Sequence, residues 1–250
     1  MSAITMLVDS GATRGSVIAR LILFLGVSGF RRFLAVLHWT VSQPLPRNLR
    51  AHRLARAIAR QAEPQRKDML RLFPRNSVGA EIGVFKGEFS RELLSMTEPT
   101  ELHLIDLWWV GYGEHYPDWG PYTDHGRLRT RDAFRQAEET AAPFQRRSRV
   151  TLHAGDGVEY LSSFPDQYFD WIYIDSSHKY EHTQRELEVA ARKVKAHGLI
   201  AGHDWEPDPE HQHHGVYRAV QELIAIAPWE IAIVDRCDPA QWCVRRRRGA

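Results

Sequence analysis

The sequence predicts an α/β fold, a doubly wound and mostly parallel sheet of seven strands, with a helical extension at the N-terminus. From about residue 70, short apolar runs alternate with segments of helical periodicity, which is typical of a parallel sheet covered by helices on both faces. Apolar residues make up 43% of the 250 residues and charged residues 26%, a globular composition that excludes global disorder and a coiled coil. Two cysteines, Cys237 and Cys243, are too few for a disulfide framework and indicate a reducing compartment, so we expect a cytoplasmic protein.

Seven apolar runs carry the prediction of the sheet. The predicted strands are residues 77–84, 102–107, 150–153, 170–174, 199–201, 229–234 and 242–244. Helical spacing of apolar residues follows the first strand through Phe89 and Leu94, recurs near residues 130–140, and recurs again at 183–194 and 216–223. Gly198 is expected to end the helix that precedes the fifth strand.

The N-terminal part differs from the rest in charge. Residues 1–67 hold 11 Lys and Arg against 2 Asp and Glu, whereas the remainder has a net charge of −7. We therefore expect an extension in residues 1–67 and a catalytic domain in residues 68–250. The apolar stretch 16–41 is interrupted by Arg20, Arg31 and Arg32, so a bilayer-spanning helix is not expected. Packing against the domain or against a second copy in a homo-oligomer is favoured, and peripheral membrane contact or a targeting peptide remain open.

Candidate ligand-binding residues follow the first three predicted strands. In an open parallel sheet, ligands bind beyond the carboxyl ends of the strands. Glu81, Gly83 and Gly87 surround the first turn, where glycines allow a close approach of the backbone to a ligand. Their spacing is Gly-x-x-x-Gly and not the Gly-x-Gly-x-x-Gly of dinucleotide-binding proteins, and an acidic Glu81 suits a ligand that carries an ammonium group.

The next two strand ends carry carboxylates. Asp106 ends the second strand, where it can accept hydrogen bonds from both hydroxyls of a ribose. Asp156 and Gly157 follow the third strand, where Asp156 can accept a hydrogen bond from the exocyclic amine of adenine.

The fourth and fifth strand ends carry a second cluster of polar residues. Asp175 and His178 follow the fourth strand, and His203 and Asp204 follow the fifth. Two carboxylates at adjacent strand ends are costly to bring together unless a cation is bound. We therefore predict a divalent metal at Asp175, Asp204 and His203, with His178 free to act as a base.

Together these residues resemble the class I S-adenosylmethionine-dependent methyltransferases, over about residues 70–235. The likeness is greatest to sugar O-methyltransferases of the macrocin and mycinamicin type. It is carried by Ile174-Asp175-Ser-Ser-His178-Lys-Tyr180 and by Gly198-Leu-Ile-Ala-Gly-His203-Asp204. The resemblance implies a Rossmann-like fold and S-adenosylmethionine as cofactor.

The resemblance also implies a role for each candidate residue. The set Glu81, Gly83 and Gly87 would shape the methionine end of the cofactor pocket, Asp106 would bind the ribose, and Asp156 with Gly157 would border the adenine. A magnesium or manganese ion would be held by Asp175 and Asp204, with His178 as base. The family usually has an acid at the position of His203, and imidazole is a better ligand for manganese, zinc or iron than for magnesium. Three alternatives therefore stay open: a different metal, a His203 side chain that turns away from the metal, or a weakened metal site.

The acceptor is expected to be a hydroxylated small molecule and not a nucleic acid, because the main domain is net acidic. Residues 108–147 begin with an aromatic segment that we expect to form an acceptor-binding lid. For His211, His213 and His214 a solvated loop is favoured, with an additional metal contact as the alternative. The arginine run 245–248 is expected to be a solvated tail. Two other functions stay open: a nicotinamide-dependent oxidoreductase, and a non-catalytic scaffold at a membrane surface in glycan or lipid assembly.

Overall fold

The computed structural model describes residues 69–226, 228–235 and 240–247. The predicted N-terminal extension, its apolar stretch 16–41 and Cys237 lie outside these residues. Among the helices of the described part, none has both the length and the apolar character needed to cross a bilayer.

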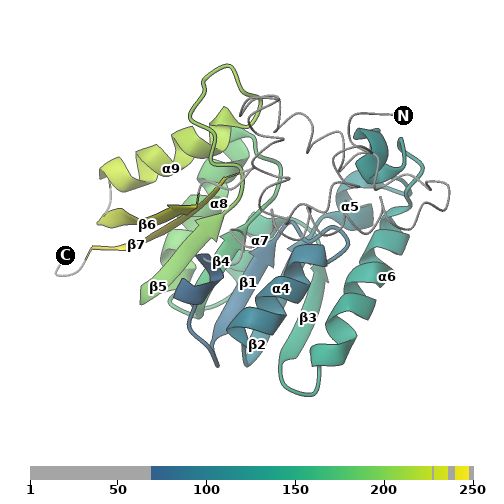
Figure 1. Ribbon diagram of the computed structural model, residues 1–250, viewed down its shortest axis with the longest axis horizontal. Helices are drawn as coiled ribbons and strands as arrows, with labels where there is room; N and C mark the ends of the chain where they lie inside the picture. Colours follow the sequence, from purple (N-terminus) through teal and green to yellow (C-terminus); the bar gives the residue numbers. More distant parts are fainter. Residues whose placement is uncertain (1–68, 227, 236–239, 248–250) are drawn as a thin grey trace, which may run out of the picture. The chain divides into compact units, whose positions relative to one another are not determined.

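Within the described residues, seven strands form one sheet in the order β3-β2-β1-β4-β5-β7-β6, which confirms the predicted fold class (Figure 1). The first five strands pair in parallel, and β7 pairs antiparallel with both β5 and β6. The strands are β1 (Val78–Ile82), β2 (Glu101–Asp106), β3 (Arg149–Ala154), β4 (Phe169–Ile174), β5 (Val194–Gly202), β6 (Trp229–Asp235) and β7 (Gln241–Arg246).

Helices cover both faces of the sheet. In Figure 1, α4 and α6 lie in front of the parallel strands, and α7 and α8 lie behind them. The α-helices are α4 (Glu88–Thr97), α5 (Trp108–Tyr112), α6 (Thr130–Ala141), α7 (Gly157–Ser163), α8 (Tyr180–Lys193) and α9 (His214–Ile226). Short 3₁₀ helices are η2 (Met69–Leu72), η3 (Gly120–Thr123) and η4 (Ala142–Phe144).

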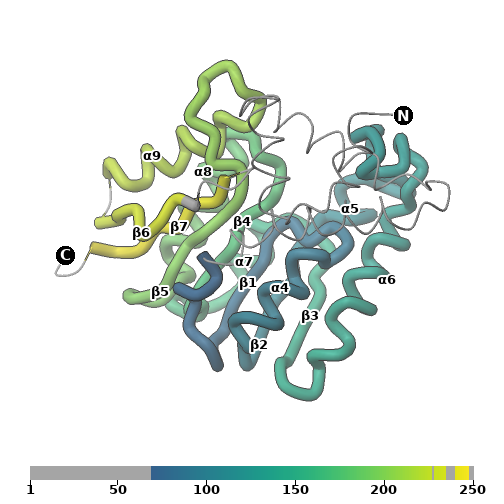
Figure 2. The backbone as a smooth tube through the Cα atoms, in the orientation of Figure 1, coloured from purple at the N-terminus to yellow at the C-terminus, as the bar shows by residue number. Residues whose placement is uncertain are grey.

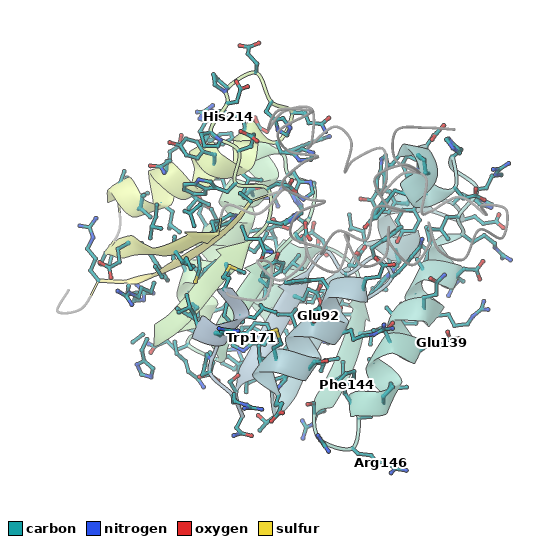
Figure 3. The ribbon with its side chains drawn as sticks, in the orientation of Figure 1. Glu92, Glu139, Phe144, Arg146, Trp171 and His214 are labelled. Atoms are coloured by element: carbon teal, nitrogen blue, oxygen red, sulfur yellow. The ribbon has the colours of Figure 1, made fainter. Side chains whose placement is uncertain are left out.

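The core is divided by the sheet into two apolar layers. Alternate residues of a strand point to opposite faces, so β4 sends Trp171 into the layer beneath α4 and α6 and Ile172 into the layer beneath α8 and α9. The Trp171 indole is fully buried, and its Nε1 donates a hydrogen bond of 2.9 Å to Ser77 Oγ (Figure 3). Burial of the side chains on both faces explains why β1 and β4 each hold only one charged residue.

Two predictions about the ends of elements are wrong. Gly198 does not end a helix, because α8 already ends at Lys193 and Gly198 lies inside β5. The apolar Val194, which fits the helical spacing, is instead the first residue of β5 and is fully buried.

The arginine run is not a solvated tail over its described part: Arg245 Nε donates to Glu230 Oε1 at 2.8 Å, and the Arg246 guanidinium lies 4.6 Å from the centre of the Trp229 ring.

Candidate active site

The predicted site residues meet at one edge of the sheet because the strands that carry them run in parallel. Ile82 at the end of β1 pairs with Ile105 of β2 and with Ile174 of β4, and Ile174 pairs in turn with Gly202 of β5. The loops after these strands therefore begin side by side. Figure 2 shows the segments that follow β2 and β5 leaving the sheet at the same edge.

The turn after β1 requires glycine. Gly83 has a φ of 88°, and a Cβ atom on it would lie 1.9 Å from the carbonyl oxygen of Asp175. The backbone of this turn therefore packs directly against the turn after β4, with no room for a side chain between them. Gly87, the other glycine of the predicted motif, has a φ of 76° and forms the N-cap of α4.

Asp106 fixes the conformation of this turn from the neighbouring strand. Its Oδ2 accepts hydrogen bonds from the backbone N–H groups of Val84 at 2.8 Å and Phe85 at 2.7 Å, and its Oδ1 accepts one from Trp108 at 3.1 Å. Burial raises the pKa of Asp106 more than these N–H groups lower it. Since each carboxylate oxygen can accept two hydrogen bonds, Oδ1 retains capacity for a ribose hydroxyl.

Glu81 and Asp156 also make protein contacts that the sequence does not reveal. The Glu81 side chain is 1% exposed and accepts a hydrogen bond from Ser90 Oγ of α4. Asp156 is the N-cap of α7, where its Oδ1 accepts hydrogen bonds from the N–H groups of Val158 and Glu159. Its Oδ2 lies 3.4 Å from His182 Nε2, at the rim where adenine is expected.

The second cluster forms as predicted. Asp175, His178, His203 and Asp204 each place one ligand atom within 4.8 Å of the others. His178 Nε2 lies 3.1 Å from Asp175 Oδ1 and 3.0 Å from Asp204 Oδ2. His203 Nδ1 lies 3.4 Å from Asp175 Oδ1 and 3.1 Å from Asp204 Oδ2. Two carboxylates and two imidazoles are a donor set that binds divalent metals.

The charges of this cluster are strongly coupled. Burial alone would raise the pKa of Asp175 and Asp204, but the imidazoles of His203 and His178 outweigh burial and hold both pKa values well below their usual range. Burial would lower the pKa of His178, but its hydrogen bonds to both carboxylates outweigh burial and raise that pKa to about 10. The two carboxylates thus stabilise a positive charge on the imidazole of His178, which lies between them.

His213 is a member of this cluster that the sequence left open. Its Nδ1 lies 2.9 Å from Asp204 Oδ1, and its ring centre is 4.6 Å from that of His178. His213 stands in the loop just before α9, beside His214, which is labelled in Figure 3. One residue of the His-x-His-His segment thus contacts the Asp175–Asp204 cluster, while His211 is exposed.

Glu186 is a buried acid that the sequence analysis missed. It lies on α8, is fully buried, and its Oε2 accepts a hydrogen bond of 2.7 Å from Ser176 Oγ in the loop after β4. Its Oε1 is 3.4 Å from His182 Nδ1. Burial raises the pKa of Glu186 from 4.5 to about 7. The spacing of His182 and Glu186 by four residues on one helix was a signal that could have identified the pair.

The aromatic segment after β2 packs against the turn after β1. Tyr122 stacks on Phe85 with ring centres 4.2 Å apart, and Tyr116 meets Phe85 edge-on at 5.1 Å. Tyr122 and Trp119 remain 56% and 45% exposed. The segment thus presents aromatic rings to solvent next to the turn after β1.

The sheet is of the Rossmann-like type, and a family comparison gives the class of protein to which it belongs. A profile of the methyltransferase domain family matches residues 80–205, from β1 to just beyond Asp204. The chain belongs to this family. No curated protein matches the chain significantly.

Solved structures share the fold at low sequence identity. Cofactor-bound Rv0187 from MTB has a TM-score of 0.53 at 15% identity, covering 82% of this chain and 99% of its own. The O-methyltransferase from Bacillus cereus in complex with SAH has a TM-score of 0.52 at 12% identity, covering 85% and 97%. The putative rRNA-methylase from Clostridium thermocellum has a TM-score of 0.52 at 12% identity, covering 74% and 96%. These likenesses concern the fold, and two of the proteins differ in kind, one being an O-methyltransferase and one a putative rRNA-methylase.

Proposed function

We propose that the chain transfers the methyl group of S-adenosylmethionine to a hydroxyl group of a small molecule. The observation that carries this proposal is the cluster of Asp175, His178, His203 and Asp204 at the strand ends next to the glycine turn after β1. Family membership supports the methyl transfer and its cofactor. It also weighs against the nicotinamide-dependent oxidoreductase and the non-catalytic scaffold.

In this proposal, the first three strand ends bind the cofactor. The turn around Gly83 and Gly87 faces its methionine end, next to Glu81. Asp106 accepts a hydrogen bond from the ribose through Oδ1, and Asp156 with Gly157 borders the adenine. Residues 68–250 form the catalytic domain and residues 1–67 are an extension to it.

The second cluster would bind a divalent metal and the acceptor. The donor set fits such an ion, since Asp175, His203 and Asp204 bring two buried or half-buried carboxylates and an imidazole together. A metal bound there supplies a lower pKa for the acceptor hydroxyl and fixes the direction of its oxygen.

His178 is the proposed base. Its Nε2 lies 3.0–3.1 Å from Asp175 and Asp204, and these carboxylates hold a proton on the imidazole. A cation held by Asp175 and Asp204 would offset their charge, so that Nε2 could release this proton and then take the proton of the acceptor hydroxyl. His178 has a φ of 58°, so the loop after β4 turns sharply at this residue and returns its side chain to the sheet edge. Transfer from a sulfonium is an in-line displacement in which an O–C bond forms as the C–S bond breaks. The acceptor oxygen must therefore lie on the side of the methyl carbon opposite the sulfur, about 3–3.5 Å from that carbon.

The test separates binding from chemistry. His178→Ala should lower kcat by about 100-fold or more, the typical contribution of a general base, while the affinity for S-adenosylmethionine stays unchanged. His197→Ala, which removes an exposed imidazole from the other half of β5, is the matched control and should retain full activity. Full activity of His178→Ala would refute the base assignment. Rates that survive exhaustive chelation would instead indicate a metal-free methyltransferase.

A further inference from the structure

The metal cluster differs from an all-carboxylate site in the number of imidazoles around it. His178, His203 and His213 all lie within 3.1 Å of an oxygen of Asp204. Imidazole nitrogen binds manganese, iron, cobalt, nickel, copper and zinc, whereas magnesium favours carboxylate, carbonyl and water oxygens. The chemistry of the donors therefore distinguishes between classes of metal.

The backbone of His203 is fixed in position beside the two carboxylates. It is 9% exposed, and its backbone is fixed from both neighbouring strands: its N–H donates to Ile174 O at 3.2 Å, and its carbonyl accepts from Trp242 Nε1 at 3.0 Å. The backbone of His203 is therefore fixed just beyond the end of β5, with its imidazole beside Asp175 and Asp204.

The spacing of the donor atoms fits coordination of such a metal. Metal–ligand distances of about 2.0–2.1 Å put neighbouring ligands about 3.0 Å apart in an octahedron and about 3.4 Å apart in a tetrahedron. His203 Nδ1 is 3.1 Å from Asp204 Oδ2 and 3.4 Å from Asp175 Oδ1. His178 Nε2 lies at similar distances, 3.1 Å from Asp175 Oδ1 and 3.0 Å from Asp204 Oδ2. With His178 kept apart as the proposed base, Asp175, His203 and Asp204 would be three ligands and would leave positions open for an acceptor, as in catalytic rather than structural sites.

His213 completes the site from outside the ligand set. It contacts Asp204 through Oδ1, whereas His178 and His203 meet the same carboxylate at Oδ2. A hydrogen bond from His213 therefore fixes the orientation of the carboxylate and turns Oδ2 toward the centre of the cluster. Partners that orient a ligand in this way typically change metal affinity by about 10–100-fold.

We infer that this cluster selects a transition-metal ion over magnesium through His203, and that His213 is a positioning residue for Asp204. The inference rests on the proposed function for the assignment of the cluster as a metal site. It goes further in naming the class of metal and the role of the loop before α9.

The test of metal class is a calorimetric titration of the full, chelator-stripped chain with manganese, zinc and magnesium chlorides in turn. Manganese and zinc should bind at least about tenfold more tightly than magnesium. His203→Asp should shift this preference toward magnesium, because it replaces the imidazole with a hard oxygen ligand. Equal affinity for the three ions, no binding of any, or an unchanged preference in His203→Asp would each overturn the inference.

A spectroscopic measurement detects the imidazole directly and covers the case in which His203→Asp does not fold. Pulsed electron paramagnetic resonance of the manganese-loaded chain should show nitrogen hyperfine coupling that is lost in His203→Ala. Absence of nitrogen coupling in the unsubstituted chain would refute coordination by His203.

The positioning role has its own matched pair of variants. His213→Ala should weaken manganese binding by about 10–100-fold and leave the nitrogen coupling at saturation unchanged. His197→Ala, which removes an exposed imidazole from β5, should bind manganese normally. Equal manganese affinities of the two variants would refute the positioning role of His213.

Titration with S-adenosylmethionine in the same samples separates the two proposals. Cofactor binding and methyl transfer with no metal preference overturn only this inference, whereas a chain that binds no S-adenosylmethionine overturns the proposed function.

Discussion

The buried acid of α8 leads to a quantitative prediction. Glu186 is fully buried between α8 and the loop after β4, and burial raises its pKa from 4.5 to about 7. Between these pH values the native state binds a proton that the unfolded state has released. Stability therefore falls as the pH rises from 4.5 to 7, and above pH 7 the full cost of a buried carboxylate remains.

The magnitude follows from the two pKa values. They differ by about 2.5, and each pKa unit corresponds to about 1.4 kcal/mol, so ionisation costs the native state about 3 kcal/mol at pH 8. Glu186→Gln keeps the shape of the side chain and an oxygen that can accept the hydrogen bond of Ser176, but it carries no charge. The variant should therefore be more stable than the unsubstituted chain at pH 8, by up to about 3 kcal/mol, and of similar stability near pH 4.5.

Urea unfolding monitored by tryptophan fluorescence at pH 4.5, 6 and 8 measures this difference. Glu188→Gln removes an exposed carboxylate from the same helix and serves as the control, with little effect at any pH. A stability difference between Glu186→Gln and the unsubstituted chain that does not change with pH would refute the account of Glu186.

Three further predictions concern the sheet and its edge. Burial lowers the pKa of His103 to about 4, so this imidazole stays neutral in the native state while it is protonated in the unfolded state. The free energy of unfolding should therefore decrease by up to about 3 kcal/mol as the pH falls from 6.5 to 4. His103→Gln should show a smaller decrease in acid unfolding, and an equal decrease would contradict this prediction. Gly83→Ala should destabilise the chain by about 3 kcal/mol or more, because its Cβ would overlap the Asp175 carbonyl at positive φ; an unchanged melting temperature would show that the turn can adapt. Asp106→Ala should abolish binding of S-adenosylmethionine in calorimetry. The substitution removes the hydrogen bonds to the N–H groups of Val84 and Phe85 that fix the turn after β1, and it removes the proposed acceptor of the ribose hydroxyl. An unaltered affinity would exclude both the structural and the ribose-binding role of Asp106.

The sequence was most informative where local pattern and topology agree. Each predicted strand corresponds to an observed one, because both faces of the sheet are buried and the apolar runs are therefore nearly continuous. The parallel arrangement then brings residues from distant strands to one edge, which is why Asp175 and Asp204 could be expected to meet.

Tertiary contacts explain what could not be predicted. Helical periodicity extends through Val194, yet that residue pairs with Phe169 and begins β5, so pairing between strands overrides the local pattern. The contact between His213 and Asp204 depends on the path of the loop before α9, which no spacing in the sequence specifies. The hydrogen bonds that raise the pKa of His178 likewise depend on atomic positions at two strand ends.

A crystal structure of the chain with S-adenosylhomocysteine, the demethylated product, shows where the cofactor binds. We predict its ribose at Asp106, its adenine beside Asp156 and Gly157, and its sulfur directed toward His178. A nucleoside bound elsewhere, or a strand edge at Gly83 and Asp106 that remains closed to the ligand, would contradict the assignment of this edge as the site of methyl transfer.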